Sequence, residues 1–385
     1  MTTQPQAEPD TEQSVTLMLT GDVMTGRGID QILPHPASPE LYEPFVRDAR
    51  DYVRLAERAN GEVLRPAPFD YIWGDALAEL ARFGPAIRLI NLETAVTRHA
   101  TPWPDKGINY RMHPDNIGCL RAADVQCCTL ANNHVLDWHY AGLEETLAVL
   151  ERSGIAYAGA GENLADASRP ARLPLASGGK VLVWSFGLTD SGIPEEWQAT
   201  RSQAGVHLVH EDSPAEVEAL ARGIETEKGR GDIAVMSVHW GSNWGYEIPA
   251  THRHLAHRLI DAGADIIHGH SSHHPRGMEV YRGKPILYGC GDLINDYEGI
   301  GGHEEFHPDL ALLIFCRWQL DREAPGALWM TPLRRRHFAL EHVSEDEAHW
   351  LRDTLTQERR PGSPPLTVDR DNRLRWQHAQ ATATS

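Results

Sequence analysis

Carboxylate, amide and imidazole side chains follow five short apolar stretches of the sequence. Each stretch resembles VTLMLT, which precedes Gly21-Asp22, and has the composition of a buried strand. The polar residues at the ends of these stretches are Asp22, Glu93, Asn133 with His134, His239, and His270 with His273. Oxygen and imidazole ligands together suit Mn, Fe, Zn or Mg ions, and no Cys-x-x-Cys pair offers the thiolates of a closed zinc site. The pattern therefore predicts a metal site.

The five stretches must belong to strands whose ends meet. They cover residues 15–20, 88–92, 125–131, 233–238 and 265–267, and helical patterns lie between them at 71–83, 141–153, 214–228 and 252–262. Strands that alternate with helices predict an α/β fold. Ligands of open α/β sheets bind outside the carboxyl ends of the strands, so we expect the five polar ends to face one crevice.

The composition excludes several classes of protein. The 385 residues carry 36 Lys and Arg against 54 Asp and Glu, a net charge of −18, which argues against nucleic acid as a partner. There is no signal peptide pattern and no run of about 18 apolar residues. Five Cys residues do not indicate a disulfide framework. We therefore expect a cytoplasmic protein without a membrane segment.

The sequence predicts three regions. Residues 1–14 are expected to form a disordered leader, and residues 15–343 the main domain. Within that domain, residues 34–68 begin with a Pro-rich stretch and continue as a charged helical one, which indicates an insertion over one edge of the sheet. Residues 344–358 have the pattern of an amphipathic helix, and a polar tail follows from Pro361, so that helix and tail together occupy 344–385.

The motifs around the polar ends resemble those of the CapA/PgsA-type poly-γ-glutamate (capsule) biosynthesis proteins, which look like relatives of the calcineurin-like metallophosphoesterases. The resemblance covers about residues 15–340. It rests on GDVMTGR (21–27), INLETAVT (90–97), LANNHVLDW (130–138), SVHWGSNW (237–244) and LIDAGADIIHGHSSHHPRGMEVYRGKPILYGCGD (259–292). It implies a four-layer α/β/β/α sandwich of two mixed sheets flanked by helices.

The resemblance also implies a role for each residue of the predicted site. The first metal ion would take Asp22 and His273, Glu93 would bridge to a second ion, and that second ion would take Asn133, His239 and His270. One or two divalent ions per chain would activate a water and hold the oxygens of a displacement at phosphorus. His134 would lie beside the leaving group as a general acid, and Arg27 would pair with an anionic group of the substrate.

Four further residues bear on this assignment. Met24 stands where the family pattern has a His ligand of the first ion, and Asp292 is a carboxylate that would face the site and partly replace it. His274 competes with His273 as a ligand. Asp137 has two interpretations: it accepts the N–H of a site histidine, or it caps a helix that begins near Tyr140.

The function that the resemblance implies is that of a CapA-like protein of poly-γ-glutamate or capsule biosynthesis. Its metal centre would hydrolyse phosphoester-type bonds of an anionic small-molecule or polymer substrate. The alternative is a non-catalytic component that binds a polyanion or a metal ion in a system for polymer synthesis or processing. Metal content and turnover of an aryl phosphate distinguish the two.

Overall fold

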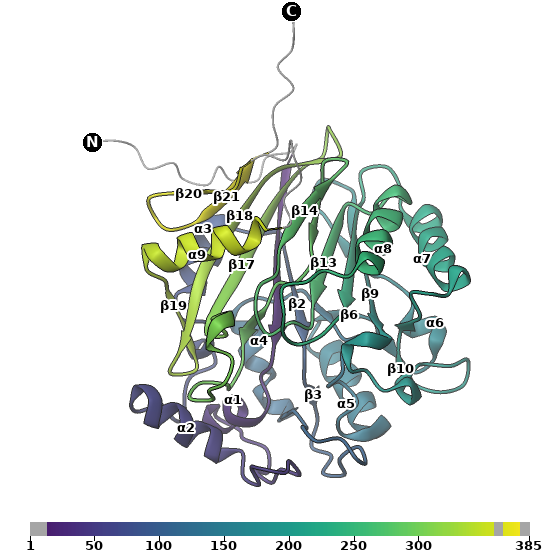
Figure 1. Ribbon diagram of the computed structural model, residues 1–385. Coiled ribbons are helices and arrows are strands. Elements are labelled where there is room, and N and C mark those ends of the chain that lie inside the picture. The colour runs from purple at the N-terminus through teal and green to yellow at the C-terminus, as the bar shows by residue number, and fades with distance from the viewer. Residues whose placement is uncertain (1–13, 358–364, 378–385) are drawn as a thin grey trace, which may run out of the picture.

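The computed structural model describes residues 14–357 and 365–377. Within these residues ten strands form a mixed sheet in the order β20-β21-β18-β17-β1-β2-β5-β6, with β16 beside β1 and β19 beside β18 (Figure 1). The bounds of its strands are β1 Ser14–Val23, β2 Ile87–Leu92, β5 Cys127–Thr129, β6 Ala156–Ala158, β16 Asp292–Ile294, β17 Leu310–Gln319, β18 Ala324–Arg336, β19 Ala339–His342, β20 Thr367–Val368 and β21 Leu374–Gln377.

A second mixed sheet has the order β11-β9-β12-β13-β15-β14, with β8 beside β9. The bounds of its strands are β8 Ala171–Pro174, β9 Lys180–Leu188, β11 Leu208–Val209, β12 Ile233–His239, β13 Ile266–His270, β14 Met278–Tyr281 and β15 Lys284–Leu287. Two short pairs join β3 Ala95–Val96 to β4 Arg111–Met112 and β7 Ala160–Gly161 to β10 Gly205–Val206. All five predicted strands are therefore confirmed, and they divide between the two large sheets.

Helices connect the strands. Their bounds are α1 Arg27–Ile32, α2 Arg50–Asn60, α3 Ala76–Phe83, α4 Gly118–Ala122, α5 His139–Arg152, α6 Leu164–Ala167, α7 Pro214–Glu227, α8 Ala250–Asp261 and α9 Glu345–Leu355. Short 3₁₀ turns lie at Tyr71–Trp73, Pro114–Ile117, Thr189–Ser191, Glu195–Trp197 and Glu304–Phe306. The helices predicted at 141–153, 214–228 and 252–262 are confirmed as α5, α7 and α8. The one predicted at 71–83 is split into a 3₁₀ turn and α3.

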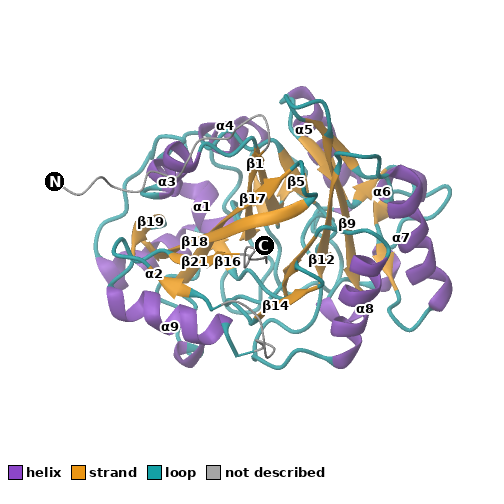
Figure 2. Ribbon diagram, turned by 90° about the horizontal axis from the view of Figure 1, so that it is seen from above, coloured by secondary structure: helices purple, strands orange, loops and turns teal. Residues whose placement is uncertain are grey.

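The two sheets pack face to face. Side chains alternate between the two faces of a strand, and Val15 and Leu17 of β1 lie in one apolar cluster with Val181 and Val183 of β9. The residues between them point the other way, so that Leu182 of β9 belongs instead to a cluster beneath α7 and α8. Figure 2 shows α7 and α8 on the outer side of this sheet. The second sheet is therefore covered by the first sheet on one face and by helices on the other.

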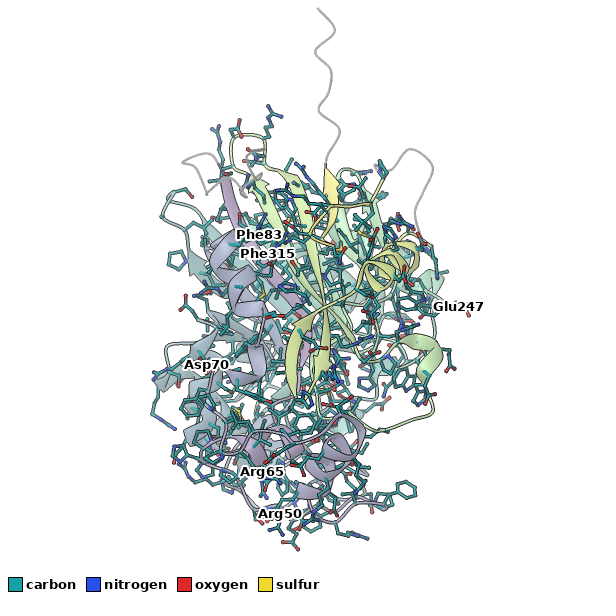
Figure 3. The ribbon with its side chains drawn as sticks, turned by 90° about the vertical axis from the view of Figure 1, so that its left-hand side faces the viewer. Arg50, Arg65, Asp70, Phe83, Glu247 and Phe315 are labelled. Atoms are coloured by element: carbon teal, nitrogen blue, oxygen red, sulfur yellow. The ribbon has the colours of Figure 1, made fainter. Side chains whose placement is uncertain are left out.

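The outer face of the ten-stranded sheet is covered in the same way. Met18 of β1 packs in a cluster with Leu80 of α3 and Leu147 of α5. Phe83 of α3 stacks on Phe315 of β17 with ring centroids 4.0 Å apart (Figure 3). The order of layers is helix, sheet, sheet, helix, which confirms the four-layer sandwich of two mixed sheets that the resemblance implies.

The structure places the insertion and revises the tail. The insertion at 34–68 lies at the carboxyl end of β1, where α1 and α2 are side by side (Figure 1) and Glu43 and Tyr52 bind Arg27. The polar tail is wrong for residues 365–377: β21 pairs with β18 and buries Leu374 and Trp376.

The termini of the main domain agree more closely with the prediction. Ser344 begins the C-terminal helix α9 with a capping box to Glu347. Residues 1–13 of the predicted leader lie outside the described residues, and Ser14 already belongs to β1. Among the described residues, no helix has the length and apolar character needed to cross a membrane.

Candidate metal centre

Two aspartates face each other where β1 ends. Asp22 lies in register with Asp292, the first residue of the parallel strand β16, and both are fully buried. The preceding residue must be glycine, because a Cβ on Gly21 would lie 1.8 Å from the carbonyl oxygen of Gly291. His273 places its Nδ1 3.0 Å from Asp292 Oδ1, and ligand atoms of the three side chains lie within 4.8 Å of one another. Asp292 therefore faces the site, as predicted.

Two histidines face each other in the second sheet. His239 and His270 end the parallel strands β12 and β13 in register, and their Nδ1 atoms are 3.0 Å apart. The hydroxyl of Ser237 lies 2.9 Å from His270 Nε2 and fixes that ring. Asp22 Oδ1 is 3.7 Å from His270 Nδ1, so Asp22, His239 and His270 form a second group of potential ligands. Asp22 belongs to both groups and joins them.

Glu93 adjoins Asp22 without belonging to either group. Asn91 Nδ2 donates to Asp22 Oδ1 at 2.7 Å and to Glu93 Oε2 at 3.0 Å, which holds the two carboxylates side by side. Asn133 Oδ1 is buried and accepts no hydrogen bond. The structure therefore brings five of the six predicted ligands together at the strand ends, with Asp22 at their centre, and the contacts of the described residues do not place Asn133 among them.

This cluster has the properties of a cation site. Burial, and then the charge of Asp292, raise the pKa of Asp22 to about 7, and burial with the charges of Asp22 and Asp292 raises the pKa of Glu93 well above its ordinary range. Burial lowers the pKa of His239 to about 3, so its ring is neutral and offers a lone pair. His239 Nε2 and Asn133 Oδ1 are buried without a hydrogen-bond partner in the part of the chain that the structure describes. Crowded carboxylates and unused acceptors fit divalent ions bound by oxygen and nitrogen.

His134 lies beside Glu93 of this cluster, with an acidic partner on its other ring nitrogen. Its Nδ1 is 2.7 Å from Asp137 Oδ2, and its Nε2 is 3.9 Å from Glu93 Oε1. Burial and the charge of Lys106 lower the pKa of His134 to about 4, so the ring is neutral near pH 7. Of the two interpretations of Asp137, the structure supports the acceptor of a histidine N–H. Helix α5 begins at His139 after Trp138, and no side chain caps it.

Arg27 differs from its prediction. Its guanidinium donates to Asp296 at 3.0 and 2.5 Å, to Glu43 at 2.9 Å and to the hydroxyl of Tyr52 at 3.0 Å, and the residue is 3% exposed. Two carboxylates already neutralise this cation, so it is not presented to a substrate. Glu43 comes from the insertion and Asp296 from the loop after β16, and both segments bring their carboxylates to Arg27.

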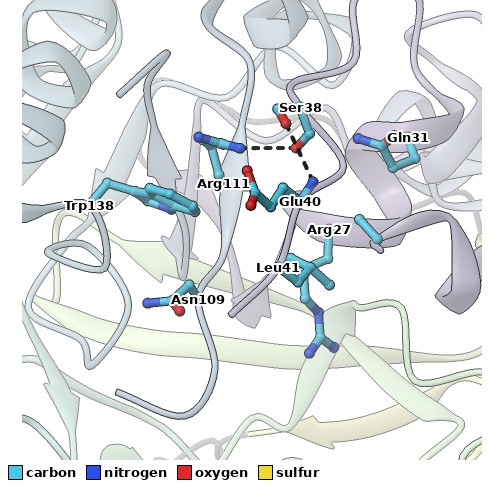
Figure 4. Close-up of a pocket in the computed structure, with 9 residues that line it drawn as sticks. Arg27, Gln31, Ser38, Glu40, Leu41, Asn109, Arg111 and Trp138 are labelled. Atoms are coloured by element: carbon cyan, nitrogen blue, oxygen red, sulfur yellow. Dashed lines mark hydrogen bonds between the residues drawn. The ribbon is translucent and has the colours of Figure 1, made fainter. Parts of the chain in front are cut away.

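A small cavity lies beside Arg27 (Figure 4) and is lined by Arg111, Asn109 and Trp138 among others. It has about 10 Å³ of room for the centre of a water molecule, which is enough for one water and not for a substrate. Arg111 donates to the carbonyl oxygens of Ser38 and His99. The cavity therefore belongs to the packing of the insertion and not to the metal centre.

His274 is not in either group of potential ligands. Its ring stacks against Phe306 with centroids 4.8 Å apart and against Trp244 at 5.9 Å. Its neighbour His273 takes the place beside Asp22 and Asp292. The choice between the two histidines is thus made by packing.

Sequence analysis did not single out three residues that shape the site. Asn91 is one of them, and the other two are Ser237, on β12, and Lys106, whose ammonium lies 2.7 Å from Asp137 Oδ1 and 3.1 Å from His134 Nδ1. Asn91 and Ser237 each precede a predicted ligand by two residues and therefore share its face of the strand, a signal that was available. Lys106 belongs to an irregular loop, and no pattern pointed to it.

Comparisons with known proteins identify the family of this chain. The family model described as bacterial capsule synthesis protein PGA_cap matches residues 16–297. A probable polyglutamine synthesis accessory protein of Mycobacterium tuberculosis is 48% identical over 345 residues, which are 89% of this chain and 90% of that protein. The PGA biosynthesis protein CapA of Bacillus subtilis is 26% identical over 294 residues, which are 76% of this chain and 66% of that protein.

One solved structure similar to this chain is the crystal structure of a novel phosphatase from Mycoplasma pneumoniae. The two align with a TM-score of 0.47 and 12% sequence identity, over 83% of this chain and 94% of that one.

Proposed function

We propose, from the premise that this chain belongs to the bacterial capsule synthesis protein family PGA_cap, that it is a metal-dependent hydrolase of phosphoester-type bonds. Its relatives are named for polyglutamine synthesis and for PGA biosynthesis, and we extend such a role to this chain. Its substrate is then an anionic intermediate, or a polymer linked to one, in the making or processing of a polyglutamate-type polymer.

One observation carries the proposal. Asp22 is shared by two buried groups of ligand-type side chains, Asp22-His239-His270 and Asp22-His273-Asp292. Two such groups that share a carboxylate would suit a pair of divalent ions. Divalent ions bound there would act as Lewis acids on a phosphoryl oxygen and would lower the pKa of a water. Mn, Fe, Zn and Mg all suit the donor set.

The residues of the chain prepare the centre for this role. Asn91 holds the carboxylates of Asp22 and Glu93 side by side through both of its amide protons. Ser237 orients the ring of His270. Rings and carboxylates that are already in place lose little conformational freedom when ions and substrate bind, which favours catalysis.

His134 is the proposed proton carrier. Its Nδ1–H donates to Asp137. Its Nε2 therefore carries the lone pair, and this nitrogen is the one that lies toward Glu93. Nε2 can take a proton from a water and return it to the leaving oxygen of the substrate. Lys106 binds Asp137 from the other side and keeps that carboxylate in place.

The experiment is hydrolysis of para-nitrophenyl phosphate by the protein supplied with Mn. We expect turnover in the wild type, and its loss in His239→Ala and Glu93→Ala. His254→Ala is the matched control, because His254 is an exposed histidine of α8 and should leave turnover unchanged. Equal turnover in all variants would contradict the proposal. A wild type that binds metal and hydrolyses no phosphoester would favour the non-catalytic alternative.

A further inference from the structure

Two phenol groups meet beside the proposed centre. Tyr110 precedes β4, Tyr297 follows β16, and their hydroxyl oxygens are 3.1 Å apart. The ring of Tyr110 stands perpendicular to His134, with centroids 4.6 Å apart and an angle of 83°. The ring of Tyr297 stands perpendicular to His273 in the same way, at 5.2 Å and 83°. The hydroxyl pair therefore links the ring that contacts His134, the proposed proton carrier, with the ring that contacts His273, a potential metal ligand.

The Tyr110 side of the pair is fixed by the acid that orients His134. The backbone N–H of Tyr110 donates to Asp137 Oδ2 at 2.6 Å, and its carbonyl oxygen accepts from the indole of Trp138 at 2.9 Å. The guanidinium of Arg27 lies 4.3 Å from the centroid of the Tyr110 ring. The backbone of Tyr110 is thus held by the same carboxylate as the histidine that its ring contacts.

The Tyr297 side of the pair is also fixed by hydrogen bonds to an acid that binds a histidine. Its backbone N–H donates to Asn295 Oδ1 at 3.1 Å, and Asn295 Nδ2 donates to Asp292 Oδ2 at 2.6 Å. Asp292 in turn binds His273. The preceding residue, Asp296, holds Arg27. Each tyrosine is therefore tied to the carboxylate partner of its own histidine, so the two hydroxyl groups have a fixed position relative to the centre.

Only one of the two hydroxyl protons is used in the hydrogen bond between the tyrosines. The Tyr110 hydroxyl donates to the Tyr297 oxygen, and the proton of the Tyr297 hydroxyl has no acceptor among the described residues. Tyr110 is fully buried, whereas Tyr297 is partly exposed. Tyr297 therefore offers one unused O–H donor on a ring that contacts His273.

We propose that the Tyr297 hydroxyl donates a hydrogen bond to a phosphoryl oxygen of the ligand held at the metal centre, with Tyr110 orienting it. The pair is then an oxyanion subsite, in addition to the predicted ligands, and it takes the substrate-binding role that sequence analysis gave to Arg27. The guanidinium of Arg27 packs against the rings of both tyrosines. This inference rests on the proposed function, because the metal centre is what brings the phosphoryl group to the phenol.

The test is binding of inorganic phosphate to the Mn-supplied protein by isothermal titration calorimetry, with metal content measured on the same samples. A hydrogen bond to a charged oxygen is strong, so we expect Tyr297→Phe to weaken phosphate binding about ten-fold while metal content is unchanged. Tyr110→Phe removes only the orienting hydroxyl and should weaken binding less. Tyr157→Phe is the matched control, because the Tyr157 phenol binds Glu151, and should leave binding unchanged.

Equal phosphate binding in the wild type and Tyr297→Phe would overturn the inference, as would a larger loss in Tyr110→Phe than in Tyr297→Phe or a loss of metal in Tyr297→Phe. The proposed function fails differently. A wild type that binds phosphate through Tyr297 and does not hydrolyse para-nitrophenyl phosphate would contradict hydrolysis and support the subsite. A wild type that holds metal and binds no phosphate would contradict both.

Discussion

Asp22 and Asp292 lie opposite each other on the neighbouring parallel strands β1 and β16, and Asp22 also reaches His270 in the other sheet. The site is therefore assembled across both sheets of the sandwich, at the end where their parallel strands finish. Because Asp22 serves both groups of ligands and Asp292 serves one, the two aspartates should respond differently to substitution.

We expect Asp292→Ala to lose about half of the bound metal and Asp22→Ala to lose nearly all of it. The carboxylate of Asp292 serves only the group with His273, whereas Asp22 serves both groups. Elemental mass spectrometry of the two variants after reconstitution with Mn measures this. Equal losses in the two variants would show that the groups do not bind separate ions.

Arg27→Met should destabilise the protein by about 3–5 kcal/mol, because it leaves the carboxylates of Asp296 and Glu43 buried without their cation. Urea unfolding measures the change. Arg50→Met removes an exposed ion pair with Asp48 and should leave stability unchanged. An Arg27→Met protein of normal stability with a strongly raised KM would restore the role of Arg27 as a direct substrate ligand.

Asp137→Asn should lower kcat about 100-fold and leave KM and metal content nearly unchanged. The amide has the same shape, but it carries no charge and one acceptor oxygen instead of two, so it holds the Nδ1 proton of His134 less firmly and does not neutralise Lys106. Steady-state kinetics with para-nitrophenyl phosphate measures the effect. The control is Asp115→Asn, at an exposed acid that pairs with Arg98. A kcat equal to that of the wild type would remove His134 and Asp137 from the mechanism.

Metal should raise the melting temperature more at about pH 8 than at about pH 5. The pKa of Asp22 is raised from 3.8 to about 7, so in the absence of metal the folded protein keeps a proton there that the unfolded chain releases from about pH 4 upward. The stability that this proton gives is complete at low pH and is lost as the pH rises through 7. A bound cation replaces the proton. Differential scanning calorimetry with and without Mn would contradict this if the gain were larger at the lower pH.

Much of the centre was predictable because strand ends are visible in the sequence. Asp22, His239 and His270 each end a short apolar run, and parallel strands bring such ends together. Asp292 was predictable because the sequence departs from the family pattern at this position and offers a carboxylate there. The four layers were implied by the resemblance and are explained by the alternation of side chains in β1 and β9.

The remaining features depend on contacts between distant parts of the chain. Arg27 meets Asp296, 269 residues away, and nothing near it in sequence indicates that it is neutralised. Lys106 reaches Asp137 from a loop without periodicity. Residues 374–377 have a polar neighbourhood and nevertheless form β21, because β18 offers them a pairing edge and an apolar face. Such outcomes are decided by tertiary packing, which local patterns do not encode.

Metal content per chain tests the central claim most directly. The protein is purified without chelator and without a nickel column, reconstituted with Mn or Zn, and analysed by elemental mass spectrometry. Two groups of ligands that share Asp22 predict about two divalent ions per chain. One ion, or none after reconstitution, would contradict the shared centre.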